Sequence, residues 1–256
     1  MQQISNRIAW ITGAGTGIGR ALALRLARDG WQVAISGRRS EPLDEVRVAA
    51  GELAGRILPL PVDVTDRAAM SAVAANIERE LGPLHLVVLG AGMFATFRAD
   101  KDFDATAFDR HYAVNLGGVI NGINAALPGL KTRRSGHIVI ISSVSGYRGL
   151  PLAAPYSSSK AALINLAESL KFDFDRLGIV TTVVNPGFVD TPLTENNTFP
   201  MPFLIDTAQA AERIHAGILR QDFEIAFPGR MAYLLKFMRC LPYGAYFWLM
   251  KRAMRR

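Results

Sequence analysis

Short apolar runs alternate with helical patterns along most of this 256-residue chain. Seven runs that suit buried strands occur at residues 7–11, 32–36, 57–62, 85–89, 137–142, 179–184 and 224–227. Segments with helical periodicity separate them, at residues 18–28, 41–53, 66–81, 105–130, 156–177 and 208–220. Continuous apolar strands that alternate with helices are typical of a mostly parallel sheet that is covered on both faces. The pattern therefore predicts a doubly wound α/β fold with a seven-stranded sheet.

The size and composition of the chain suit one such domain. Half of its residues are hydrophobic, which is enough to bury a sizeable core. We assign residues 1–228 to the α/β domain and residues 229–256 to a helical extension of it. The first strand begins too early to leave room for a signal peptide, and no apolar run reaches the ~20 residues of a spanning helix. A cytoplasmic protein is expected.

A glycine-rich turn directly follows the first predicted strand. Gly13, Gly17 and Gly19 have the spacing G-x-x-x-G-x-G, and Thr16 and Ile18 lie within the turn. Glycines allow backbone amides to approach a pyrophosphate, and a helix that begins near Gly17 would offer its N-terminal dipole to the same anion. The turn predicts a dinucleotide site on a Rossmann-type fold.

Tyr156 and Lys160 are four residues apart in a predicted helix, and Ser143 lies thirteen residues before Tyr156. Residues at i and i+4 share a helix face, so the Lys160 ammonium is expected beside the Tyr156 phenol. A nearby cation favours phenolate and lowers the pKa of a tyrosine, which would let Tyr156 act as an acid or a base. This spacing indicates a site for redox chemistry between carbonyls and alcohols.

Further distinctive residues follow the other predicted strands. Ligands of doubly wound folds lie across the carboxyl ends of the strands. In addition to the glycine turn and Ser143, the residues at these ends are Arg38 and Arg39, Asp63 and Val64, Ala91 and Gly92, and Pro186 and Gly187. We therefore expect one composite site along this edge of the sheet.

The end of the second strand predicts the cofactor. A site for NAD usually places an acidic residue there to bind the adenosine ribose, whereas a site for NADP places an arginine near the 2′-phosphate. Gly37 takes this position and is followed by Arg38 and Arg39. Because guanidinium groups bind phosphate through paired hydrogen bonds, NADP(H) is predicted.

Together these motifs resemble the short-chain dehydrogenase/reductase family over residues 7–227. The resemblance implies that Tyr156 is the catalytic acid/base and that Ser143 hydrogen-bonds the substrate carbonyl. Lys160 would hold the nicotinamide ribose and depress the pKa of the tyrosine. Asn115 would bend its helix and hold a water that relays protons to the lysine.

The same resemblance implies further cofactor contacts. Pro186 and Gly187, with Val189 and Thr191, match the loop that orients the carboxamide, and Asp63 matches the contact to adenine. The family's Asn-Asn-Ala-Gly sequence after the fourth strand is here the segment 89–92, Leu-Gly-Ala-Gly. The loss of both asparagines puts the local bracing of that strand in doubt.

Relatives of this kind pair through the helices that contain Asn115 and Tyr156. Both helices carry small residues that permit close packing, namely Gly117, Gly118, Ala161 and Ala162. A two-fold homodimer is expected.

The segment 191–205 stands where the family has its substrate-covering lid. It carries Phe199, Met201, Phe203 and Leu204, and Phe94 and Phe97 could face it. A lipophilic or aromatic carbonyl or alcohol is the expected substrate. Two other functions remain open: a non-catalytic redox sensor that binds NADP, and a membrane-surface interaction protein.

The end of the chain is basic and apolar. No acidic residue follows Glu224, whereas seven basic residues stand among aromatic and aliphatic ones in two short helical segments. The residues 230–256 suit peripheral contact with a membrane, or else cover the pocket or a subunit contact. The pI of about 9.8 also suggests nucleic-acid binding as a function, but no recognition motif in the sequence supports it. The single cysteine and the four histidines lack metal-ligand spacing, so no metal is predicted.

Overall fold

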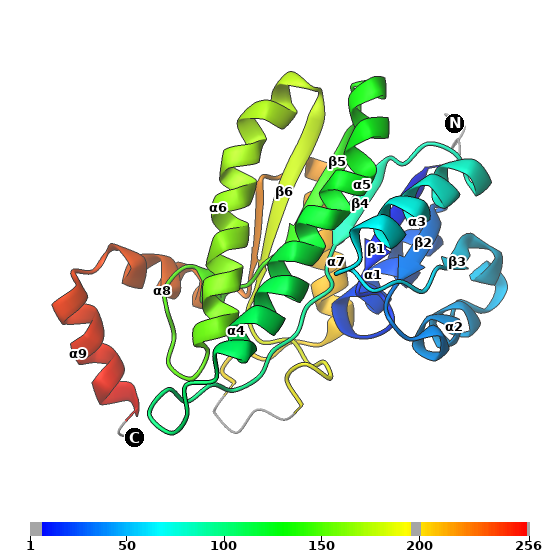
Figure 1. Cartoon of the computed structure of the whole chain (residues 1–256). Coiled ribbons are helices and arrows are strands. Elements are labelled where there is room, and N and C mark those ends of the chain that lie inside the picture. Colours follow the sequence, from blue (N-terminus) through cyan, green and yellow to red (C-terminus); the bar gives the residue numbers. More distant parts are fainter. Residues whose placement is uncertain (1–6, 196–200, 255–256) are drawn as a thin grey trace.

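A computed structural model describes residues 7–195 and 201–254. Its seven strands form one parallel sheet in the order β3-β2-β1-β4-β5-β6-β7 (Figure 1). The strands are β1 (Ile8–Thr12), β2 (Gln32–Ser36), β3 (Ile57–Pro59), β4 (Leu86–Leu89), β5 (Gly136–Ile141), β6 (Ile179–Pro186) and β7 (Glu224–Phe227). The predicted doubly wound Rossmann-type fold is confirmed. The strand order reverses between β1 and β4, which is where ligands bind in such folds.

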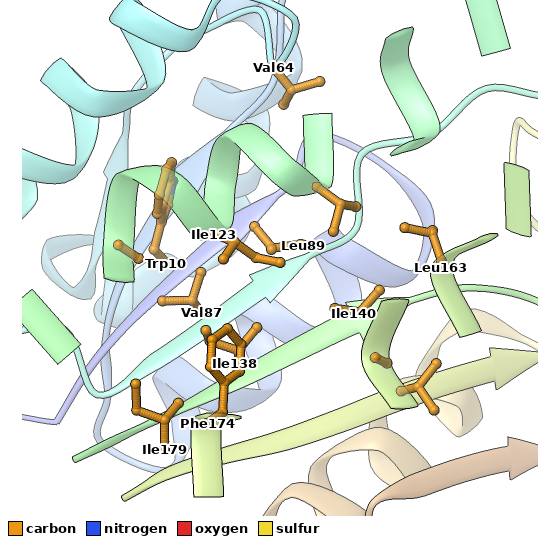
Figure 2. Close-up of a cluster of buried hydrophobic side chains, with 14 of the residues drawn as sticks. Trp10, Val64, Val87, Leu89, Ile123, Ile138, Ile140, Leu163, Phe174 and Ile179 are labelled. Carbon is orange, nitrogen blue, oxygen red and sulfur yellow. The ribbon is translucent and has the colours of Figure 1, made fainter. Parts of the chain in front are cut away.

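Helices cover both faces of the sheet. They are α1 (Gly17–Arg28), α2 (Ser40–Ala49), α3 (Arg67–Glu80), α4 (Ala105–His111), α5 (Gly118–Arg133), α6 (Ala154–Arg176) and α7 (Thr207–Arg220). The buried side chains of α3, α5 and α6 share one core, and those of α1, α2 and α7 share the other. Strand side chains alternate between the two: Ile138 and Ile140 belong to the first core and Val139 to the second. Figure 2 shows part of the first core, where Val87 and Ile138 lie near Ile123.

One predicted helix has a different local structure. The sequence predicted a helix over residues 105–130, but α4 is followed by a π-helical turn, η2 (Tyr112–Gly117), before α5 begins. A π-helical turn inserts an extra residue into the helical ladder, and such turns are frequent at functional sites. Asn115 lies in this turn and is fully buried.

Two further elements end several residues before their predicted bounds. The helix predicted over residues 41–53 ends at Ala49, and the 3₁₀ segment η1 (Gly51–Arg56) follows it. Gly51 has a φ of +57°, which favours glycine and stops an α-helix. The strand predicted over residues 57–62 ends at Pro59, although Leu60 N and Val62 N still donate hydrogen bonds to Ile35 O and Gly37 O.

The C-terminal extension forms α8 (Gly229–Cys240) and α9 (Tyr243–Met254). Met231, Ala232 and Leu235 of α8 are part of the first core, so α8 is an integral part of the packed domain. Lys236 of α8 pairs with Glu224 of β7, which also accepts a hydrogen bond of 2.6 Å from the Tyr147 hydroxyl. Figure 1 shows α9 beside α6, standing out from the body of the molecule. Over the described ranges, no helix has the length and apolar character needed to cross a membrane.

Candidate active site

The glycine turn lies against the loop that follows β4. Gly13 has a φ of +71°, and a Cβ on it would lie 2.7 Å from the backbone of Ala91. A Cβ on Gly19 would lie 2.4 Å from the carbonyl oxygen of Gly13. Larger residues would therefore push the turn and the β4 loop apart and close the backbone cradle that a pyrophosphate needs. Thr16, the N-terminal cap of α1, and Ile18 stay partly or fully exposed beside it.

Thr12 braces the end of β4, where the sequence had left the bracing in doubt. Its Oγ1 accepts hydrogen bonds from the backbone N–H groups of Gly90 at 3.1 Å and Ala91 at 3.3 Å. One threonine on the neighbouring strand thus satisfies two amides of the loop. Sequence reasoning missed Thr12, although a polar residue that ends a buried strand immediately before a glycine turn was a usable signal.

Asn115 joins the π-helical turn to the same loop. Its Oδ1 accepts a hydrogen bond from Met93 N at 2.8 Å, and its Nδ2 donates to Met93 O at 3.1 Å and to Ser159 Oγ at 3.0 Å. These contacts use both ends of the amide group and fix its orientation. Ser159, which no sequence pattern singled out, thereby connects Asn115 to α6.

Lys160 projects from α6 into the space between β5 and the β4 loop. It is almost fully buried, and its Nζ donates a hydrogen bond of 2.9 Å to the carbonyl oxygen of Ile141. A Cβ placed on Gly92 would lie 3.6 Å from Lys160 Nζ and 3.4 Å from Asn115 Oδ1. The absence of a side chain at Gly92 therefore leaves room directly in front of the lysine and the asparagine.

Tyr156 and Ser143 face each other one helical turn from Lys160. The Tyr156 ring centroid lies 5.6 Å from Lys160 Nζ, which confirms the predicted i, i+4 neighbourhood. Ser143 caps the 3₁₀ segment η3 (Val144–Gly146), and its Oγ accepts hydrogen bonds from the backbone N–H and the hydroxyl of Ser145. The hydrogen bond that the Ser143 hydroxyl donates to Pro186 O is long, at 3.4 Å, so its proton can be redirected to a substrate oxygen.

Burial governs the titration of both groups on α6. It raises the pKa of the Tyr156 phenol, and hydrogen bonding with Ser143 offsets this only in part. It also lowers the pKa of the Lys160 ammonium to about 8. The expectation that Lys160 depresses the pKa of Tyr156 stays a prediction: the net direction here is upward because desolvation of the buried phenol is the largest influence, and Lys160 Nζ is hydrogen-bonded to Ile141 O.

Arg38 and Arg39 follow β2 and are exposed. Within the described part of the chain, neither guanidinium has an ion pair or a side-chain hydrogen bond. Asp63 lies near Arg38: hydrogen bonds from the backbone N–H and the hydroxyl of Thr65 hold its pKa below the usual range, and the Arg38 charge lowers it further. Val64, in contrast, is buried and packs against Gly118.

The loop after β6 continues the same edge. Gly187 N donates a hydrogen bond to Phe227 O at 2.6 Å, so Pro186 and Gly187 are held between β6 and β7. Val189 is buried and forms an isolated bridge with Ile205. A Cβ on Gly17 would lie 3.1 Å from Thr191 Cγ2, so the glycine turn and the segment beyond β6 are neighbours.

The apolar residues that were expected around the lid lie in different surroundings. Phe94 packs edge-on against Tyr156, with ring centroids 5.1 Å apart. Phe97 is buried in a cluster with Phe103 and Phe108, and its predicted place opposite the lid stays a prediction because residues 196–200 lie outside the described residues. Phe203 and Leu204 are exposed, and Met201 is half-buried, whereas Phe199 lies outside the described residues.

The predicted pairing surface needs a correction at Gly118. A Cβ on Gly118 would lie 2.6 Å from Val64 Cγ2, so this glycine faces the core and not the outside of α5. Gly117 and Ala162 are half-buried, and Ala161 is exposed.

Among the described residues, no cluster of three or more histidine, cysteine or acidic side chains could hold a metal ion.

The backbone cradle at Gly13 and Gly19, the space before Lys160 and the unpaired arginines suit a nicotinamide dinucleotide. Comparison with known proteins agrees with this fit. A family model described as short chain dehydrogenase matches residues 7–200. An uncharacterized oxidoreductase from Myxococcus xanthus is 38% identical over 245 residues, which cover 94% of this chain and 95% of the relative.

Solved structures share the fold. A short-chain dehydrogenase/reductase from Burkholderia phymatum, in complex with NAD, has a TM-score of 0.84 at 22% identity and covers 92% of this chain and 94% of its own. The structure of ElxO with NADP bound has a TM-score of 0.78 at 24% identity and covers 86% of this chain and 97% of its own. On the family match and the similarity to the Myxococcus relative, the chain belongs to the short-chain dehydrogenase/reductase family of NAD(P)-dependent oxidoreductases.

Proposed function

We propose that the protein reduces a carbonyl group of a lipophilic or aromatic compound with NADPH, and catalyses the reverse oxidation of the alcohol. The observation that carries this proposal is the meeting of Ser143, Tyr156, Lys160 and Asn115 in front of the glycine turn, at one edge of the sheet. Each of these side chains is at least partly buried, and each has a defined hydrogen-bond or ring contact. A binding module without chemistry would not need a buried lysine beside a tyrosine.

NADPH, when bound, supplies the hydride that reduces the carbonyl carbon. The Tyr156 hydroxyl donates the proton to the carbonyl oxygen, and its raised pKa keeps it in the protonated, donating form at neutral pH. Ser143 donates a hydrogen bond to the same oxygen and stabilises the charge that develops there. The Lys160 ammonium then stabilises the phenolate that Tyr156 becomes, and Asn115 holds the β4 loop in place through Met93.

The choice of NADPH is supported by the end of β2. Gly37 offers no carboxylate to a ribose, and the exposed guanidinium of Arg38 lies within electrostatic reach of Asp63 on the cofactor edge. A 2′-phosphate would find a cation there and no repelling acid at position 37.

The preference for a lipophilic substrate is supported by apolar side chains beside Tyr156 and on the segment beyond β6. Phe94 contacts the tyrosine ring directly, and Leu193, Phe203 and Leu204 expose apolar surface on the segment beyond β6. These side chains offer apolar contact and few charged partners, which favours ketones and aldehydes with aromatic or long aliphatic groups over sugars or small acids.

The test is the purified Tyr156→Phe variant. NADPH oxidation should be followed with a panel of aromatic and aliphatic ketones, and NADPH binding by fluorescence titration. Turnover should fall by at least a hundredfold, since general acid catalysis contributes about 10²–10⁴-fold, while the dissociation constant for NADPH changes little. Unchanged turnover in this variant would refute the proposed role of Tyr156.

A further inference from the structure

Helices α8 and α9 expose an unusual amount of apolar surface. Seven of the sixteen large hydrophobic side chains that are exposed in the described residues lie in these two helices: Tyr233, Leu234, Phe237, Tyr243, Phe247, Trp248 and Leu249. Tyr233, Leu234 and Phe237 follow the i, i+1, i+4 spacing of one helix face. Phe237 is 63% exposed and Trp248 is 62% exposed. An apolar concentration of this kind marks an interaction surface.

Among the described residues, helix α9 contacts the body through Tyr243 and Tyr246. Tyr246 is its buried anchor and donates a hydrogen bond to the carbonyl oxygen of Gly149. Arg148 lies over the rings of Tyr243 and Tyr246, 4.6 and 4.5 Å from their centroids, and donates to the carbonyl oxygens of Arg239 and Leu241. A groove of about 440 Å³ separates α9 from α6. The remaining sides of α9 therefore face solvent on an ordered support.

The exposed surface is also positively charged. Residues 229–254 contain five basic residues, Arg230, Lys236, Arg239, Lys251 and Arg252, and no acidic residue. Of these five, Lys236 pairs with Glu224, and the other four form no ion pair among the described residues. Basic residues beside exposed Trp, Tyr and Phe are the composition of a helix that lies in a bilayer interface.

We infer that α8 and α9 form a docking surface for an anionic lipid bilayer, with the aromatic side chains inserted at headgroup depth. The charge decides between this partner and a second copy of the chain. Two copies that meet through this surface would place like charges together, whereas an anionic bilayer attracts every unpaired Lys and Arg. The helices are too short and too charged to span the bilayer, so they would lie along its surface.

Trp248 offers a direct measurement. Of the three tryptophans, Trp10 and Trp31 are buried and only Trp248 is exposed. Full-length protein should be titrated with vesicles of phosphatidylcholine and phosphatidylglycerol, and with vesicles of phosphatidylcholine alone. We expect a blue shift of the tryptophan emission and co-sedimentation with the anionic vesicles, and a large loss of both in about 0.5 M salt, because salt screens the attraction.

Matched variants separate this surface from nonspecific adsorption. Lys251→Gln should weaken vesicle binding about fivefold, whereas Lys131→Gln, which removes an exposed lysine from the last turn of α5, should leave it unchanged. Phe237→Gln with Phe247→Gln should weaken it at least tenfold, whereas Phe172→Gln, at a side chain 72% exposed on α6, should not. Point variants are preferable to truncation because α8 contributes to the core.

Two outcomes would overturn the inference. One is the absence of a lipid-dependent blue shift and of co-sedimentation with anionic vesicles in low salt. The other is a blue shift that appears without lipid as protein concentration rises, together with a dimer mass that Phe237→Gln and Phe247→Gln abolish, since this would show that a second copy covers the surface. Neither result depends on turnover, so the proposed reductase activity is judged separately.

Discussion

Arg38 is the residue on which the proposed cofactor choice depends. Its guanidinium is exposed, and within the described residues it has no ion pair. Arg38→Ala should raise the KM for NADPH by about ten- to a hundredfold, because a charge-assisted hydrogen bond contributes roughly 1.5–3 kcal/mol. The KM for NADH should change little. Arg28→Ala, at an exposed arginine in the last turn of α1, is the control and should change neither constant. Equal effects of Arg38→Ala on both cofactors would contradict the assignment.

Lys160 is the residue for which function and stability oppose each other. Burial lowers its pKa to about 8 from an ordinary value of 10.5, so the folded protein holds the ammonium form at a cost of roughly 3 kcal/mol. Because the pKa is lower in the folded state, the cost is fully present below pH 8 and disappears as pH rises toward 10.5. Lys160→Met should therefore lose turnover yet unfold at higher urea concentration at pH 7. The difference in free energy of unfolding between Lys160→Met and wild-type protein should shrink between pH 8 and 10.5. A Lys160→Met protein that is less stable than wild type at pH 7 would show that the hydrogen bond to Ile141 outweighs desolvation.

Among the helices and strands, the π-helical turn η2 is the element that the sequence did not predict. Hydrophobic periodicity predicted one continuous helix over residues 105–130, because an inserted residue barely disturbs the apolar pattern. The turn depends on Asn115 reaching Met93, twenty-two positions away in the chain, and on Ser159. Such contacts arise only from tertiary structure. The family resemblance predicted a bend at Asn115 but not the partners that stabilise it.

The role of this turn can be tested by substituting Asn115, which lies in the turn, and Asn121, which lies in the following helix α5. Asn115→Leu would leave the N–H and C=O groups of Met93 unpaired, and should cost about 1–3 kcal/mol in the free energy of unfolding. It should also lower turnover by about a hundredfold, since displaced catalytic groups lose orientation. Asn121→Leu is the matched control: Asn121 is buried on α5 and hydrogen-bonds Val64 O and Arg67. It should lose similar stability in urea unfolding but retain turnover, and equal loss of turnover would argue against a positioning role for Asn115.

At the scale of the whole molecule, the alternation of strands and helices predicted the architecture well. Strands β2 and β7 have the predicted bounds, since buried apolar runs set their limits. The placement of the site at the carboxyl edge also followed, because a parallel sheet brings all such ends together. The sequence did not predict which way individual residues face: Gly118 faces the core, and Phe97 joins an aromatic cluster. Both depend on how neighbouring segments pack.

The oligomeric state of the protein can also be measured. We expect a two-fold homodimer that pairs through α5 and α6, with Gly117, Ala161 and Ala162 allowing close approach. Light scattering at micromolar protein concentration should give twice the chain mass of 27.9 kDa. Ala162→Arg should shift the mass toward that of one chain, and a monomeric wild-type protein would contradict the expectation.

The proposed activity requires that this site transfers hydride to a carbonyl compound and does not only bind the cofactor. The most direct measurement is single-turnover incubation with NADPH deuterated at C4 of the nicotinamide, followed by mass spectrometry of the products from a panel of lipophilic ketones. We expect an alcohol that carries deuterium on the former carbonyl carbon with wild-type protein, and none with Tyr156→Phe. NADPH binding without a deuterated alcohol from any ketone would refute the proposed activity and indicate a non-catalytic sensor.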